Sequence, residues 1–478
     1  MRRMIFLHTN DMHARVDGMA RVATLVEQVR REHPDTPVLY FDLGDSEDTV
    51  NRLSNLTKGV AMHRLLSIAG CDASAVGNAA ILRYGYQVLA EEAQAATYPL
   101  LLANLRLPDG SPIPGTTPTT LLDVGGVRLG LIGVTANIGN QYEKWFGLQV
   151  LPVVPLIREL SAALRQQGAD AVILLSHLGH ALNPEFHVDE ADRAIAAELQ
   201  QELTLILGAH SHHLLPEGEW VGDVLIAQAG EYAQHLGRVD LLWDGEHMRV
   251  ERATVLPVAD VPQSPRILAE SEVIEGEVER FLQVVIGELA QPLDFAADRE
   301  CGVGNLMADM LRERMRAEVG VVAVGQAFSG PLTAGPLHRV TLWDVCSSPA
   351  NPGVATMTGA QLTAMVVRGL DAEFAKDSPR AMRGQPRGLF HLSGASVRDG
   401  RLFVGDAPVE PERQYRVAGS DWELDTYGGY ADASWNLEIS YDVPVILREA
   451  LEDYFAAHQP VYVTSGRIQG SLRGPEAK

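Results

Sequence analysis

The sequence predicts two consecutive α/β domains, and three observations carry that prediction. Its 478 residues exceed what one ordinary hydrophobic core accommodates. Strand-like and helix-like runs alternate along the first half, and a second alternating pattern begins near Asn305 after a proline-rich break. We therefore expect a first domain over residues 1–256, a linker with a connecting helix over 257–287, and a smaller domain over 288–478.

In the first half, short apolar runs alternate with segments whose apolar residues recur at helical spacing. The expected strands include residues 5–7, 38–43, 72–76 and 98–103, and the expected helices are 19–31, 59–69 and 154–167. Gly125-Gly126 predicts the turn of a hairpin over residues 121–134. VLIAQAG and the pair LGRVDLLW and HMRVERATVL, turned at Asp244-Gly245, are expected to close the domain as antiparallel strands.

The second half repeats the alternation on a smaller scale. An acidic helix is expected over residues 267–286, as the connection between the domains. Beyond it the pattern predicts helices at 306–316, 359–368 and 443–457, a strand at 319–324 and a hairpin turned at Asp399-Gly400.

Composition and charge exclude several classes of function. A formal net charge of −23 opposes sequence-independent binding of a nucleic-acid duplex, which needs a basic stripe. No apolar run approaches the length of a membrane span. The first predicted strand begins almost at Met1, which leaves no room for a signal peptide. Three scattered cysteines indicate free thiols in a reducing compartment, so we expect a cytoplasmic protein.

Five apolar runs of the first half end in residues that bind hard metals. These residues are Asp11 with His13, Asp45, Asn78, His177, and His210 with His212. The carboxyl ends of parallel strands meet at one crevice, where ligands collect. Carboxylate, amide and imidazole groups without thiolate suit manganese, iron or zinc. Seven ligands exceed one tetrahedral ion but match two ions that share a carboxylate, an arrangement that clamps phosphoryl groups and generates a hydroxide nucleophile.

The motifs DMH, GD, GN, SHLG and GAHSH resemble the signature of the calcineurin-like metallophosphoesterases, specifically the 5'-nucleotidase family. GVGNLMADML and PLTAGPLHRVTLWDV resemble that family's C-terminal domain. The resemblance implies a four-layer β-sandwich flanked by helices, followed by a smaller α/β substrate domain. It also implies that Asp45 bridges two divalent ions, with Asp11, His13 and His212 completing one site and Asn78, His177 and His210 the other.

The implied function is hydrolysis of nucleotides or related phosphoesters by a hydroxide bound to the metals. The partner would then be a small phosphorylated substrate, and the sequence leaves the oligomeric state open. The chain departs from the family where a catalytic His is expected, because Ala79 occupies that position. Alanine cannot act as a general acid, and losing one costs about 10²–10⁴ in rate. His180 is the nearest alternative acid, provided that the chain is helical after His177. The other interpretation of His180, a solvated loop residue or a residue that supports the metal ligands, is the better one.

The second half departs from the family as well. Val324 and Ser329 stand where the resemblance expects an Asn and an Arg of the substrate loop. Tyr430 is a candidate for stacking on a nucleobase, and a core tyrosine is at least as good an interpretation. Two alternatives to the nucleotidase hypothesis therefore stay open. One is a phosphodiesterase or an enzyme for other good leaving groups, and the other is a metal-binding pseudoenzyme.

Overall fold

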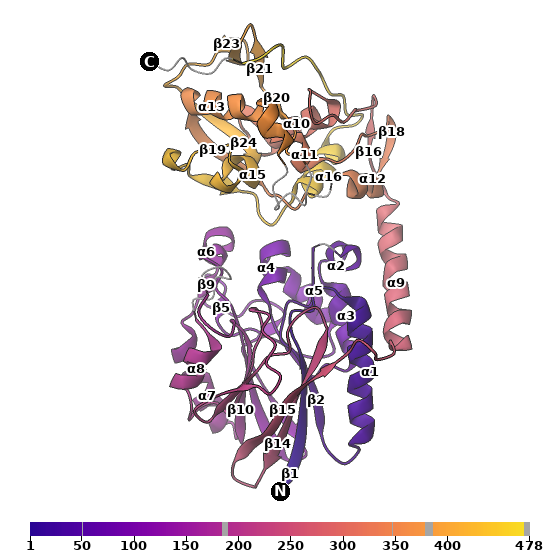
Figure 1. Ribbon diagram of the computed structural model, residues 1–478, viewed down its shortest axis with the longest axis vertical. Helices are drawn as coiled ribbons and strands as arrows, with labels where there is room; N and C mark the ends of the chain where they lie inside the picture. Colours follow the sequence, from indigo (N-terminus) through magenta and orange to yellow (C-terminus); the bar gives the residue numbers. More distant parts are fainter. Residues whose placement is uncertain (50, 184–189, 347, 378–385, 473–478) are drawn as a thin grey trace. The chain divides into compact units, whose positions relative to one another are not determined.

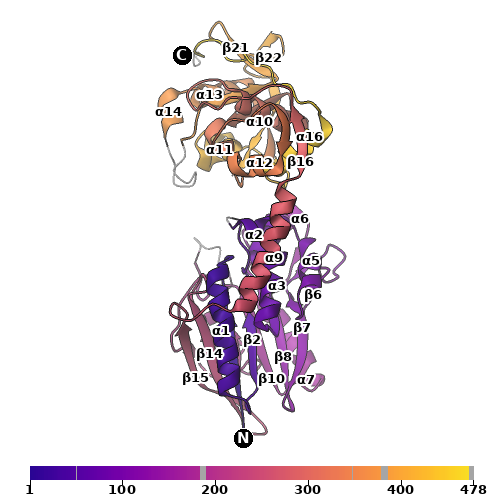
Figure 2. The same ribbon diagram turned by 90° about the vertical axis from the view of Figure 1, so that its right-hand side faces the viewer.

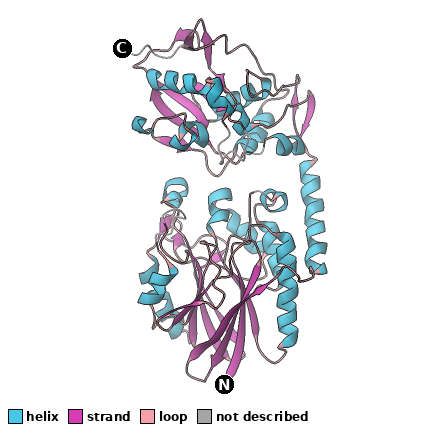
Figure 3. Cartoon of the chain, viewed as in Figure 1, coloured by secondary structure: helices cyan, strands magenta, loops and turns pink. Residues whose placement is uncertain are grey.

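Strands and helices alternate along most of the chain in a computed structural model that describes residues 1–49, 51–183, 190–346, 348–377 and 386–472. Two compact units result, Met1–Val278 and Glu279–Lys478. Figure 1 colours the chain from its first residue to its last, and Figure 3 separates helices from strands. The three-part division at residues 256 and 287 stays a prediction.

The first unit contains a seven-stranded sheet built around β1 (Arg2–Thr9). This strand pairs in parallel with β2 (Val38–Asp42) and antiparallel with β14 (His235–Trp243). The other members are β15 (Met248–Pro257), β3 (Ala73–Ala75), β4 (Leu100–Leu101) and β6 (Thr116–Thr117). The predicted pairing of β14 with β15 is confirmed.

A six-stranded sheet faces the first one. Its central strand β10 (Ala171–His177) lies parallel to β8 (Val127–Thr135) and to β11 (Leu205–Leu207). β7 (Thr119–Val124) forms the predicted hairpin with β8. The segment VLIAQAG was expected to form an antiparallel strand, and this prediction is only half right. Its strand β13 (Val224–Ala227) pairs antiparallel with β12 (Glu219–Val221) but parallel with β11.

The two sheets and their covering helices make four layers, which confirms the predicted fold class. Phe6, Phe41 and Ile173 belong to the core between the sheets. Val172 and Leu174 point the other way, into a second core with α7 (Val153–Gln166) and α8 (Asp192–Glu198). On the opposite side, α1 (Val16–Glu32) and α3 (Val60–Ala69) cover the seven-stranded sheet (Figures 1 and 2). Because the central strands are buried on both faces, their sequences are nearly continuous apolar runs.

The second unit is a mixed five-stranded sheet with helices on both faces. The strand order is β20 (Phe390–Ser393), β17 (Val319–Ala323), β24 (Gln414–Ser420), β19 (Pro352–Thr358) and β25 (Ile439–Tyr441). One core combines Val322 with residues of α10 (Gly302–Arg314) and α16 (Leu447–Ala457), and the other combines Val321 with residues of α13 (Gly359–Gly369). The predicted hairpin at Asp399-Gly400 joins β21 (Ala395–Arg398) to β22 (Arg401–Val404).

Three predicted helices of the second half begin or end elsewhere, and one of them is α10, which starts at Gly302 rather than at residue 306. The connecting helix α9 spans Pro265–Leu282 and stops before residue 286, because β16 (Val285–Leu289) pairs with β18 (Gly335–His338). The last helix begins at Leu447 rather than at residue 443. Pro444 disfavours helical geometry at Val443, so the helix does not begin at that residue. None of the described helices is long and apolar enough to cross a membrane.

Candidate metal centre

The loops that follow β1, β2 and β11 hold several residues in left-handed backbone conformations. Asp11, His13, Asp45, His210 and His212 all have φ between 46° and 69°. This conformation is uncommon for residues other than glycine and persists where surrounding contacts enforce it. Here the first two loops bond to each other, since the N–H of Asp11 donates to Gly44 O (3.1 Å) and that of His13 donates to Asp45 O (3.0 Å). The conformation of these loops thus holds the five side chains close together.

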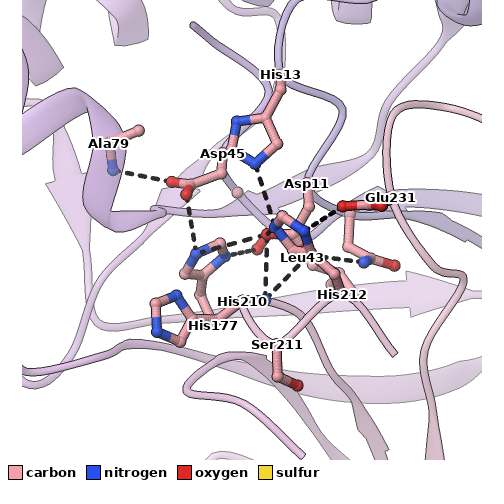
Figure 4. A network of polar contacts seen from close by, with 12 residues as sticks. Asp11, His13, Leu43, Asp45, Ala79, His177, His210, Ser211, His212 and Glu231 are labelled. Carbon is pink, nitrogen blue, oxygen red and sulfur yellow. Dashed lines mark hydrogen bonds and ion pairs between the residues drawn. The ribbon is translucent and has the colours of Figure 1, made fainter. Parts of the chain in front are cut away.

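Two groups of three side chains place their ligand atoms within 4.8 Å of one another. The first group is Asp11, His13 and His212, and the second is Asp11, Asp45 and His177. Asp11 is common to both groups, and it is fully buried. Figure 4 shows these five residues and His210 around one point. Residues that lie up to about two hundred positions apart in the sequence therefore converge where the strands end.

His177 is oriented as a metal ligand would be. Its Nδ1 donates to Leu43 O (2.7 Å), which leaves the lone pair of the neutral ring on Nε2. Nε2 lies 3.4 Å from Asp45 Oδ2 and 3.9 Å from Asp11 Oδ1. Burial opposes a charge on this ring, but the two carboxylates outweigh burial and raise the pKa of His177 to about 10. A cation between these groups would take the place of that proton.

Asp45 is held from the other side by the start of α4 (Asn78–Tyr84). The N–H of Ala79 donates to Asp45 Oδ1 (2.9 Å). A Cβ on Gly77 would lie 2.0 Å from the same oxygen, so only glycine fits beside this carboxylate. Burial acts to raise the pKa of Asp45, but the His177 ring and the Ala79 N–H hold that pKa well below its usual range.

Buried polar atoms without hydrogen-bond partners indicate that the centre fits divalent cations. Asn78 Oδ1 and His177 Nε2 are buried, and neither has a hydrogen-bond partner in the described structure. Buried polar atoms without partners are rare and costly, and a coordinated ion would satisfy both. Nε2 of His13 and Nε2 of His212 face each other at 3.3 Å, and the ring centroids of His177 and His210 are 5.3 Å apart. Oxygen and imidazole donors without thiolate suit manganese, iron or zinc.

Two residues that support the centre were not found by sequence reasoning. Glu231 pairs with Nδ1 of His212 and so fixes the orientation of that ring. Burial opposes charge on His212, but Asp11 and Glu231 raise its pKa. Asn10 donates to Asp11 Oδ2 (2.8 Å) and to Gly230 O, which holds the Asp11 carboxylate in place. Asn10 directly precedes Asp11 and could have been suspected, whereas nothing in the sequence connects Glu231 to His212.

His180 lies outside the groups described above. The residues after His177 are not helical, so the condition under which His180 would share a face with His177 fails. Nε2 of His180 is instead bonded to Glu219 (2.6 Å), and its ring centroid lies 4.8 Å from that of His213. This arrangement favours the alternative interpretation of His180 as a supporting residue.

Tyr430 is a core residue of the second unit. It is 4% exposed, and its ring lies 4.5 Å from that of Phe390 and 5.1 Å from that of Phe374. A nucleobase needs an exposed ring face, so the packing favours the core interpretation over the stacking one. The side chain of Val324 is likewise buried, and Ser329 is exposed.

Comparisons with known proteins find that this chain is similar to 5'-nucleotidases and to a metallophosphoesterase. Residues 285–433 match the family of 5'-nucleotidase C-terminal domains. The chain is 28% identical to the metallophosphoesterase YunD of Bacillus subtilis (strain 168), over 87% of this chain and 91% of that protein. It is 26% identical to a 5'-nucleotidase of Diplobatis ommata, over 66% of this chain and 60% of that protein.

A crystal structure of a 5'-nucleotidase precursor from Thermus thermophilus has the same fold. It superposes with a TM-score of 0.53 at 21% identity and covers 99% of this chain and 100% of its own. The family match lies in the second unit, and the similarity to YunD extends over both units. The chain is therefore similar over both units to metallophosphoesterases and 5'-nucleotidases, and its residues 285–433 belong to the family of 5'-nucleotidase C-terminal domains.

Proposed function

We propose that the protein is a phosphoric ester hydrolase that uses two divalent metal ions and acts on nucleotides or similar small phosphoesters. The observation that carries the proposal is the pair of ligand groups that share Asp11, buried where the strands of both sheets end. Asp11, His13 and His212 would hold one ion, and Asn78, His177 and His210 the other, with Asp45 between them. The names of the relatives, metallophosphoesterase and 5'-nucleotidase, support the same class of reaction.

The bound ions would supply a hydroxide nucleophile near neutral pH and neutralise the phosphoryl oxygens. Neighbouring residues of the chain hold the metal-binding side chains in their orientations. Leu43 O fixes the His177 ring, Glu231 fixes the His212 ring, and the Ala79 N–H fixes Asp45. These contacts hold the ligand atoms in place before substrate arrives, so little reorganisation accompanies the reaction.

Ala79 favours substrates whose leaving group needs no proton. Its methyl group cannot protonate an ester oxygen, and His180 is engaged with Glu219. A leaving group of low pKa departs as an anion, so phosphoanhydrides, aryl esters or activated diesters suit the site better than alkyl monoesters. A phosphodiesterase is for that reason the second candidate function.

The test is an assay of the purified protein with manganese against p-nitrophenyl phosphate, its bis-ester and a panel of nucleotides. The proposal expects turnover of nucleotides that disappears on chelation and returns with metal. Turnover of the bis-ester alone would identify the phosphodiesterase instead. Two bound ions by mass spectrometry without turnover of any compound would leave the pseudoenzyme alternative.

A further inference from the structure

Asp42 is a fully buried aspartate at the end of β2, outside the proposed set of metal ligands. Its neighbours Phe41 and Leu43 belong to the core between the two sheets, so the Asp42 side chain points to the opposite face of the seven-stranded sheet. Burying a carboxylate is costly unless hydrogen bonds or a cation compensate for the lost water. The groups that bond to this carboxylate therefore indicate what it does.

Three polar groups surround the Asp42 carboxylate. Thr9 Oγ1 donates to Oδ1 (2.9 Å), and Ser74 Oγ lies 3.2 Å from Oδ2. The third group is the backbone N–H of Gly44, which donates to Oδ2 (3.1 Å). Burial raises the pKa of Asp42 to about 6, so the carboxyl is ionised at neutral pH. A buried negative charge is thus bonded to the loop that follows β2 and carries Asp45.

The Gly44 N–H belongs to the same peptide group as the carbonyl of Leu43. This peptide is planar and trans, so its N–H and its C=O point in opposite directions. Leu43 O accepts the Nδ1–H of His177 (2.7 Å, Figure 4). One peptide plane therefore joins the Asp42 carboxylate on one side to the His177 ring on the other.

The orientation of this peptide needs a partner that fixes it. Gly44 has a φ of 89°, and a Cβ there would lie 2.5 Å from Gly77 N and 3.0 Å from His177 Nδ1, so only glycine fits. Glycine tolerates both signs of φ, so the backbone itself allows the preceding peptide to turn over. A turned peptide would direct its N–H toward the ring, and the bond to Asp42 opposes that.

We propose that Asp42 is a positioning residue of the metal centre, which fixes and polarises the Leu43–Gly44 peptide and thereby holds His177 with Nε2 free for the metal. The inference rests on the metal ions of the proposed function. A carboxylate behind a metal-bound imidazole orients the ring and raises its basicity as a ligand. Here the carboxylate acts through one peptide group, and the hydrogen bonds on the two sides of that peptide strengthen each other.

The test is a calorimetric titration of the metal-free protein with manganese. Asp42→Ala is expected to weaken the binding of one ion about tenfold, the lower end of what the loss of a group behind a metal ligand costs. Asp42→Asn keeps an oxygen that can accept the Gly44 N–H, so it should recover part of that loss. Asp72→Asn is the matched control, because Asp72 also accepts a backbone N–H, that of Tyr40 (2.8 Å), away from the metal-binding loops. Unchanged manganese affinity in Asp42→Ala, or an equal loss in Asp72→Asn, would overturn the proposal.

A double-mutant cycle separates an effect on His177 from a general effect on the fold. In a His177→Gln background, the Asp42 substitution should change manganese affinity by about twofold at most, because its effect passes through the ring that is now absent. The same tenfold loss in both backgrounds would show that Asp42 does not act through His177. If Asp42→Ala does not fold, Asp42→Asn takes its place in the cycle. If the wild-type protein binds manganese but hydrolyses no ester, the proposed function fails, and the titrations still decide the role of Asp42.

Discussion

The N–H of Ala79 donates a 2.9 Å hydrogen bond to Oδ1 of Asp45. The position at which the family resemblance expects a catalytic His therefore supports the centre through its backbone, while its side chain is a methyl group that takes no part in proton transfer. Because the backbone N–H of Ala79 holds Asp45, a substitution of the Ala79 side chain tests the missing general acid and leaves the Asp45 carboxylate in place.

Ala79→His should restore a general acid beside the centre. We expect hydrolysis of alkyl phosphate monoesters to rise by about 10², the lower end of what a positioned acid contributes, because Leu82 offers no carboxylate to orient the new ring. Esters of p-nitrophenol should gain little, since their leaving group needs no proton. The measurement is kcat for both ester classes in the two proteins. Equal gains for both would contradict a general-acid role.

Gly77→Ala should displace the Asp45 carboxylate. The added Cβ would lie 2.0 Å from Asp45 Oδ1 and 2.3 Å from its backbone nitrogen, so the loop after β2 must shift. Overpacking of this kind costs about 1–3 kcal/mol. We expect fewer metal ions per chain by mass spectrometry and a lower melting temperature. Gly330→Ala is the control, because its Cβ would meet only a Val345 methyl group at 3.3 Å. Full metal content in Gly77→Ala would show that Asp45 tolerates the shift.

Asp45→Asn should weaken metal binding and make the stability of the protein much less sensitive to chelators. Ions that bind only the folded state stabilise it, by about 2.7 kcal/mol for each site at a hundredfold excess over Kd. A chelator should therefore lower the melting temperature of the wild-type protein and change that of the variant much less. Calorimetric melting with and without EDTA provides the measurement. An unchanged wild-type melting temperature after verified metal removal would argue against ions at this position.

Acid should weaken the second unit through His391. The ring is fully buried, its Nε2 accepts the N–H of Cys301 (2.9 Å), and its Nδ1 donates to Leu389 O (3.1 Å). Burial lowers the pKa of His391 to about 4, whereas the unfolded chain titrates near 6.5. The unfolded state thus takes up a proton first as the pH falls. Stability that is complete above pH 6.5 should decline between pH 6.5 and pH 4, by about 3 kcal/mol in all.

Hydrogen exchange of the paired strands β17 and β20, corrected for its intrinsic pH dependence, measures this loss. His391→Leu removes the titrating group, so its protection should fall less steeply over the same pH range, even though the variant starts from a lower stability at pH 7.5. Identical slopes in the two proteins would assign the acid sensitivity to other groups.

The sequence by itself determined the alternation of strands and helices, the two-part organisation and the residues that end the first-half strands. Those features are local: apolar periodicity marks each strand, and polar residues such as Asp11, Asp45 and His177 follow directly in the chain. The ends of α9 and α16 were misplaced because strand pairing and a proline, rather than apolar spacing, decide them.

Only the tertiary structure decided how these side chains meet and what surrounds them. Glu231 pairs with His212, and the Arg15 guanidinium lies over the Tyr232 ring, through contacts between segments that no local pattern connects. The same packing encloses Tyr430 against Phe390 and directs His180 toward Glu219. The physical reason is that burial and long-range partners are properties of packed sheets and loops, and they exist only after the chain has folded.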